Sequence, residues 1–232
     1  MERRPLRIAV PKGSLFPESV ELLGRAGLDT TGLDNPGRQL RIANGDVEYM
    51  IVRPTDAPIF CAYGGADCAI AGRDCVVEAG LEVIELVDMR FGGCRFIVAE
   101  PAQCAGAAME SYASLGVLRV ATKYPRIAKA YYDSVGVQID IVKLHGNIEL
   151  APLIGMADVI VDITATGRTL RENNLRIVAD VMKSTARFVA NPASIRTDAR
   201  VRELAAALGR VCEEKEPSAP IAGADQPKKE NR

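Results

Sequence analysis

Short apolar runs alternate with amphipathic stretches along most of the chain. Runs rich in Val and Ile are typical of buried strands, and the stretches between them have the spacing of helices. The pattern predicts strands at 6–10, 47–52, 67–71, 83–87, 95–99, 117–122, 139–144, 158–163, 176–182 and 187–190. It predicts helices at 17–26, 56–63, 74–79, 104–114, 125–135, 148–155 and 198–214.

This alternation predicts an α/β protein of two lobes with largely parallel sheets. The pair Gly92-Gly93 favours a first crossover between the lobes, and segment 183–195 favours the return. We therefore expect a discontinuous first lobe, residues 1–92 plus 190–216, and an inserted second lobe, residues 93–189. Residues 217–232 are rich in Pro, Ala, Lys and Glu, which is typical of a disordered tail.

The amino-acid composition argues against several classes of protein. The 232 residues carry a net charge of −1 and only 5% aromatic side chains, which argues against a nucleic-acid binder. No apolar run has the length of a signal peptide or a membrane span, which predicts a cytoplasmic protein with no membrane partner. Six cysteines without a C-x-x-C pair, beside a single histidine, do not form a zinc pattern, so we expect reduced, mostly buried thiols and no metal ligands.

The segment from Asp158 to Leu170 carries the clearest chemical signal. An apolar strand ends at Asp162, a loop with hydroxyls and Gly167 follows, and then a helix begins. Backbone N–H groups and the helix dipole in such a loop favour phosphate, and the acid can accept hydrogen bonds from ribose hydroxyls. Asp158 lies about 13 Å away along the strand and cannot share that site. An ordinary Thr-capped turn remains the alternative.

The loop resembles the one with which phosphoribosyltransferases bind 5-phosphoribosyl 1-diphosphate (PRPP). Type I enzymes normally have two adjacent acids before the loop, but here Val161 stands in the first position. That difference argues against a salvage phosphoribosyltransferase, which remains one alternative. A non-enzymatic ligand-binding protein with the same lobed fold is another.

Further motifs resemble the ATP phosphoribosyltransferase family, which catalyses the first step of histidine biosynthesis. The likeness covers about residues 6–195, with its motifs in the family's order. The motifs are Arg7-Ile-Ala-Val-Pro-Lys12-Gly13-Ser14-Leu15, Val52-Arg53-Pro-Thr-Asp56-Ala-Pro58, Gly65-Ala-Asp67-Cys-Ala-Ile-Ala-Gly72-Arg73-Asp74-Cys-Val-Val-Glu78, Arg119-Val-Ala-Thr122-Lys123-Tyr124-Pro125 and Leu144-His-Gly146-Asn-Ile-Glu149-Leu-Ala-Pro152.

The resemblance implies a pentosyltransferase (EC 2.4.2.17) in which N1 of ATP attacks C1 of PRPP and displaces diphosphate, with Mg²⁺ carried on the diphosphate. It implies two lobes similar to type II periplasmic-binding proteins, with the active site in the interlobe cleft. The chain length resembles the short form. That form pairs with a regulatory subunit similar to histidyl-tRNA synthetase in a hetero-octamer, and a homodimer of catalytic subunits is also expected.

Site residues follow from these matches. We expect catalytic roles for Asp162, Glu149 and Lys12. The expected PRPP-binding residues are Asp162, Thr164, Ala165, Thr166, Gly167, Arg168, Thr169 and Leu170. The expected ATP-binding residues are Lys12, Gly13, Arg53, Arg73 and Asp74.

Each assignment has a simpler alternative. Lys12 has the sequence context of a surface lysine in a βα loop, and Arg53 could form a salt bridge with Asp56 or Asp74. Glu149 could be an ordinary charge in the first turn of a helix. Asp74 and Glu78 lie on one face of a helix and could be caps or solvated charges. His145 replaces the serine more usual in the family, so it receives no catalytic role.

Overall fold

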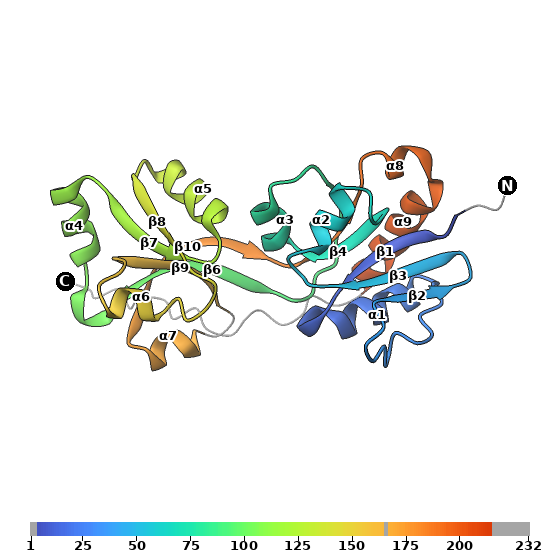
Figure 1. Ribbon diagram of the computed structural model, residues 1–232, viewed down its shortest axis with the longest axis horizontal. Coiled ribbons are helices and arrows are strands. Elements are labelled where there is room, and N and C mark those ends of the chain that lie inside the picture. Colours follow the sequence, from blue (N-terminus) through green and yellow to red (C-terminus); the bar gives the residue numbers. More distant parts are fainter. Residues whose placement is uncertain (1–3, 165–166, 215–232) are drawn as a thin grey trace.

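The computed structural model describes residues 4–164 and 167–214, which form two lobes arranged along the long axis of the molecule (Figure 1). Each lobe has one sheet. In the first, the strand order is β2-β3-β1-β4-β11-β5, and in the second it is β10-β6-β9-β7-β8. The strands are β1 (Leu6–Pro11), β2 (Arg41–Asn44), β3 (Val47–Val52), β4 (Cys68–Gly72), β5 (Ile84–Asp88), β6 (Cys94–Pro101), β7 (Leu118–Thr122), β8 (Ile139–Lys143), β9 (Val159–Thr164), β10 (Leu175–Ser184) and β11 (Ala186–Ala190).

Helices cover both faces of each sheet. In the first lobe, α1 and α9 pack on one face, and α2 and α3 on the other. In the second, α4 and α5 cover one face, and α6 and α7 the other. The helices are α1 (Phe16–Arg25), α2 (Ala57–Ala62), α3 (Arg73–Ala79), α4 (Ala107–Leu115), α5 (Pro125–Val135), α6 (Leu150–Leu153), α7 (Arg168–Glu172), α8 (Ser194–Thr197) and α9 (Ala199–Glu214).

Side chains along β9 point alternately to the two faces of the sheet and so contact different helices. On β9, Val159 and Val161 join the core under α4 and α5, whereas Ile160 joins the core under α6 and α7. Successive side chains of a strand point to opposite faces. Asp162 therefore belongs to the α6–α7 side, at the carboxyl end of its strand.

The prediction of largely parallel sheets was wrong. Four neighbouring pairs run parallel, namely β1 with β3 and β4, and β7 with β8 and β9. Five run antiparallel, including β6 with β9 and β11 with β4. Strands β6 and β11 start at the crossover, where β9 and β4 end, so they run against these neighbours. The short edge strand β2 was not predicted, because only Ile42 of its four residues is buried.

The return crossover lies earlier than the predicted boundary between 189 and 190. Strand β10 ends at Ser184 in the second sheet, and β11 begins at Ala186 in the first. Residues 186–189 therefore pair within the first lobe, because β11 lies between β4 and β5. The other crossover contains Gly92 and Gly93, between β5 and β6.

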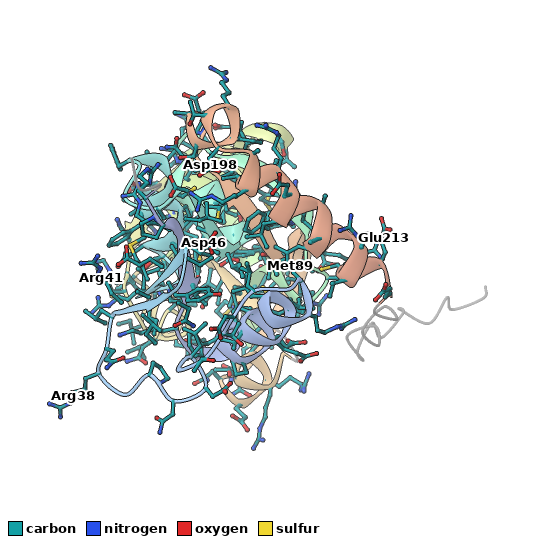
Figure 2. All side chains as sticks on the ribbon, turned by 90° about the vertical axis from the view of Figure 1, so that its right-hand side faces the viewer. Arg38, Arg41, Asp46, Met89, Asp198 and Glu213 are labelled. Carbon is teal, nitrogen blue, oxygen red and sulfur yellow. The ribbon has the colours of Figure 1, made fainter. Side chains whose placement is uncertain are left out.

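The C-terminal helix returns to the first lobe. Five buried residues of α9, among them Val201, Leu204 and Leu208, pack in the core that also holds α1. Figure 2 views this lobe end-on, with α9 running from the side of Asp198 toward Glu213. Within the described residues, no helix is both long and apolar enough to span a membrane.

Four of the six cysteines are buried, Cys94 is half-buried and Cys104 is exposed. Burial raises the pKa of the Cys61 thiol to about 12, which keeps it protonated and unreactive at neutral pH. The sulfur atoms therefore act mainly as small apolar groups.

A buried carboxylate joins distant segments of the first lobe. Asp67 accepts two hydrogen bonds from the guanidinium of Arg4 at 2.8 and 3.0 Å, and one from the backbone N–H of Arg7 at 3.0 Å. The hydroxyl of Ser194 donates another at 2.8 Å. Burial alone would raise the pKa of Asp67, but these donors outweigh it and lower the pKa to about 2.

Asp67 should therefore contribute to acid unfolding. Because its folded-state pKa is depressed, its stabilisation is present above about pH 4 and is lost as the pH falls toward 2, a change of about 2 kcal/mol. We expect Asp67→Asn to lower the free energy of unfolding at pH 7 and to flatten its decline between pH 5 and 2.5. Urea unfolding across that range measures both, with the exposed Asp140→Asn as control. An unchanged pH profile for Asp67→Asn would contradict the expectation.

Candidate active site

Parallel strands β7 and β9 end at the same edge of the second sheet, beside the crossover. The start of β6 confirms this placement, because Arg95 is paired with Thr164 at the end of β9. A cavity of about 590 Å³ opens at this edge. Asp162, Glu149 and Thr169 line it, so the structure brings together three of the predicted residues. It adds Lys123, Tyr124 and His145, which the sequence analysis did not place there.

The carboxyl group of Asp162 sits in an environment that works against its charge. Burial raises its pKa, and the nearby Glu149 raises it further. The backbone N–H of Ile163, which donates to Asp162 at 2.8 Å, and the ammonium of Lys123 oppose that shift. Glu149 immediately precedes α6 and makes no capping hydrogen bond through its side chain.

A hydrogen bond connects the end of β9 with the residue that precedes α7. The hydroxyl of Thr164 accepts it from the backbone N–H of Gly167 at 2.8 Å. Gly167 has φ +69°, a conformation that favours glycine, and leads directly into α7. Ala165 and Thr166, both predicted to bind PRPP, lie outside the described residues.

Two other predicted loop residues point elsewhere. Leu170 is 5% exposed and packs in the core under α6 and α7, so its side chain anchors the helix and does not face a ligand. Arg168 forms an exposed ion pair with Glu172 at 2.7 Å, one turn further along α7. Thr169 alone of these helix residues lines the cavity.

Lys123 and Tyr124 are held at the cavity by the end of β7. The hydroxyl of Thr122 donates to the carbonyl of Val161 on β9 at 2.7 Å and accepts the N–H of Tyr124 at 2.9 Å. The Tyr124 ring packs edge-on against Phe96, 4.8 Å between ring centroids. Lys123 could have been found from the sequence as a cation directly after a strand, once β7 and β9 were known to be neighbours.

Predicted cations of the first lobe share one sheet edge. Lys12, Arg53 and Arg73 directly follow the parallel neighbours β1, β3 and β4, and all three are exposed. This edge also adjoins the crossover, because the N–H of Arg73 donates to the carbonyl of Thr185 at 3.0 Å. The described residues contain no salt bridge from Arg53 to Asp56 or Asp74, the simpler alternative for Arg53.

Gly13 has φ +84° and begins the short 3₁₀ turn Gly13–Leu15 after β1. This turn also touches the crossover, because a Cβ on Gly92 would lie 2.2 Å from the side chain of Leu15. The segment 12–15 therefore packs directly against the crossover that contains Gly92.

Asp74, predicted to bind ATP, does not join this row of cations. It is 8% exposed, and its carboxylate accepts a 2.8 Å hydrogen bond from the hydroxyl of Ser184 at the end of β10. The same hydroxyl accepts the N–H of Asp74 at 3.0 Å. Asp74 thus ties the first lobe to the return crossover through the Ser184 hydroxyl, and among the described residues its carboxylate caps no helix N–H.

Asp158 also has a structural partner. Burial alone would raise its pKa, but the guanidinium and backbone N–H of Arg119 lower it, at distances of 2.7 and 2.8 Å. It precedes β9, at the end opposite Asp162, which agrees with the separation predicted from strand geometry.

Residues 53–210 match the family model described as ATP phosphoribosyltransferase. The chain belongs to the ATP phosphoribosyltransferase family. A relative from Moorella thermoacetica with that name is 48% identical over 84% of this chain and 87% of its own length. One from Rubrobacter xylanophilus is 45% identical over 89% of this chain and 96% of its own. The predicted family is confirmed, and the relatives are pentosyltransferases by name.

A solved structure of the same family has the same fold. The ATP phosphoribosyl transferase (HisG:HisZ) complex from Thermotoga maritima matches with a TM-score of 0.76 and 32% identity, over 90% of this chain and all of that one. The VFT2 domain of Bordetella pertussis BvgS matches with a TM-score of 0.51 and 15% identity, over 91% of this chain and 88% of that one. The second likeness concerns the fold alone, and it confirms the prediction of two lobes like those of periplasmic-binding proteins.

Proposed function

We propose that this chain condenses ATP with PRPP, forming phosphoribosyl-ATP and diphosphate. The observation that carries the proposal is the cavity beside the crossover, where Asp162, Glu149, Thr169 and Lys123 meet. The hydroxyl of Thr169, at the start of α7 in the cavity lining, can donate to the 5-phosphate of PRPP. The carboxylate of Asp162 accepts hydrogen bonds from the ribose hydroxyls.

The chemistry requires charge placement more than proton transfer. N1 of adenine is unprotonated at neutral pH and attacks C1 of the ribose without a strong base. As the bond from C1 to the diphosphate breaks, positive charge develops on the ribose and negative charge on the leaving group. Fixed cations stabilise that leaving group, and anionic oxygens near the ribose stabilise its positive charge.

Residues from both lobes would divide this work. Asp162 and Glu149 lie on the ribose side, and Lys123 lies beside them within reach of the diphosphate. Across the crossover, Lys12, Arg53 and Arg73 form a row of cations that suits the triphosphate of ATP. We infer that the interlobe cleft holds both substrates, with attack across it.

Magnesium belongs to this proposal as part of the substrate. The oxygens of the PRPP diphosphate are the hard ligands that Mg²⁺ prefers, and the ion neutralises charge on the leaving group. The Glu149 carboxylate, at the start of α6, has the donor chemistry to contact that ion or the ribose.

We further propose that the chain works as a short-form catalytic subunit. The Thermotoga relative is described as a HisG:HisZ complex, and this chain covers all of the matched chain of that complex. A regulatory partner similar to histidyl-tRNA synthetase, a catalytic homodimer and a hetero-octamer follow as parts of the proposal, as does a cytoplasmic location.

The test incubates the chain with ATP, PRPP and Mg²⁺, with and without a synthetase-like subunit, and follows product in the near ultraviolet. We expect product that requires both substrates and forms faster when the subunit is present. Turnover of hypoxanthine or guanine in place of ATP would favour a salvage enzyme. Folded protein without turnover in either mixture would contradict the proposal.

A further inference from the structure

Helix α5 in the second lobe begins without a cap of its own. Its N-cap residue, Tyr124, makes no side-chain hydrogen bond to the first turn, and Pro125 follows. The first N–H groups of a helix need acceptors from elsewhere. Here a residue of the other lobe supplies them.

Glu78, on α3 of the first lobe, caps α5 across the lobe boundary. Its carboxylate accepts the backbone N–H of Arg126 at 3.1 and 3.2 Å, and that of Ile127 at 3.1 Å. A carboxylate at this position also interacts favourably with the helix dipole. Figure 1 shows α3 and α5 facing each other where the lobes meet.

The contact is reciprocal. The guanidinium of Arg126 lies over Gly80, the left-handed residue that ends α3, where an added Cβ would come within 2.4 Å of Cζ. One residue before Glu78, Val77 packs against the apolar core of the second lobe. The end of α3 and the start of α5 therefore interlock through a cap, a close approach and an apolar contact.

Both ends of α3 are tied to the second lobe's framework. Asp74 at its start is bonded to Ser184 at the end of β10, and Glu78 in its last turn holds α5. A short helix fixed at both ends fixes the angle between the lobes. It also fixes Lys123 and Tyr124, which directly precede α5 and line the cavity.

We propose that Glu78 is an interlobe positioning residue, which sets the lobe angle and the Lys123–Tyr124 wall of the substrate cavity without touching substrate. The inference rests on the proposed function only for its effect on PRPP. The cap and the lobe angle are properties of the free protein.

The test compares Glu78→Ala and Glu78→Gln with wild type and with Glu82→Ala, an exposed glutamate of the same lobe as control. Hydrogen exchange reports the amides of Arg126 and Ile127, and small-angle X-ray scattering of the full chain reports the lobe arrangement. We expect Glu78→Ala to speed exchange at those amides and to enlarge the radius of gyration. Glu78→Gln, which keeps an acceptor oxygen, should fall in between.

Isothermal titration with PRPP then measures the consequence. Glu78→Ala should weaken binding about tenfold, as expected when the binding-competent arrangement is less populated, with Glu78→Gln partly restoring it. If wild type fails to bind PRPP, the proposed function fails, and exchange and scattering still judge the cap. Unchanged exchange and scattering in folded Glu78→Ala and Glu78→Gln would overturn the inference, as would unchanged PRPP affinity where wild type binds.

Discussion

Replacing Asp162 with alanine should weaken PRPP binding about a hundredfold, because two hydrogen bonds from ribose hydroxyls to a carboxylate are lost. The fold should not suffer. Burial raises the pKa of Asp162, which means that folding works against its charge. Removing the carboxyl group should therefore leave the free energy of unfolding unchanged or slightly increased.

Titration calorimetry with PRPP and urea unfolding measure the two effects separately. Asp162→Asn, which keeps one acceptor oxygen, should bind more weakly than wild type and more tightly than the alanine variant. Asp140→Ala, an exposed acid on β8 of the same lobe, is the matched control and should change neither quantity. Wild-type affinity in Asp162→Ala would refute the assignment of this carboxylate to the ribose.

Asp158 and Asp162 lie in different electrostatic environments, and the difference supports a functional role for Asp162. Both acids belong to one apolar segment, yet the pKa of Asp158 is lowered by Arg119, whereas that of Asp162 is raised. A carboxylate kept in a place that disfavours it, beside a cavity, is typical of a functional site.

Local sequence patterns were sufficient to predict those features whose structure depends on residues close together in the chain. The apolar run at 159–161 followed by Asp162 predicted a buried strand with an acid at its carboxyl end, and Gly167 predicted a turn into a helix. These features depend on neighbours within a few residues, so one sequence contains them. The lobed α/β fold followed from the repetition of such units.

Contacts between distant segments could not be predicted in this way. The antiparallel direction of β6 and β11 depends on where each crossover delivers the chain, which no local pattern encodes. The sequence predicted that Asp74 binds ATP, but its carboxylate accepts a hydrogen bond from the hydroxyl of Ser184, 110 residues away. For Glu78 the sequence left a cap or a solvated charge open, and the helix that it caps, α5, lies in the other lobe. Lys123 lies at the cavity because β7 pairs with β9, and this pairing could not be predicted from the local sequence.

The second large effect is expected when Lys123 is replaced, because its charge lies where the diphosphate would leave. Among the described residues that line the cavity, it is the only lysine or arginine, and its charge acts on Asp162. Its ammonium lies 5.9 Å from the centre of the Tyr124 ring, at the end of β7. A cation held there can stabilise the charge that develops on departing diphosphate, which Asp162 cannot do.

Lys123→Ala should therefore lower kcat about a hundredfold, the usual cost of removing one positioned donor from a developing anion, with a smaller effect on PRPP affinity. Lys129→Ala on α5 is the matched control, because that exposed lysine only pairs with Asp133 one turn away. The steady-state assay with ATP and PRPP separates kcat from KM. A purely electrostatic partner of Asp162 would instead raise KM for PRPP and spare kcat, so this split decides whether Lys123 acts on the leaving group.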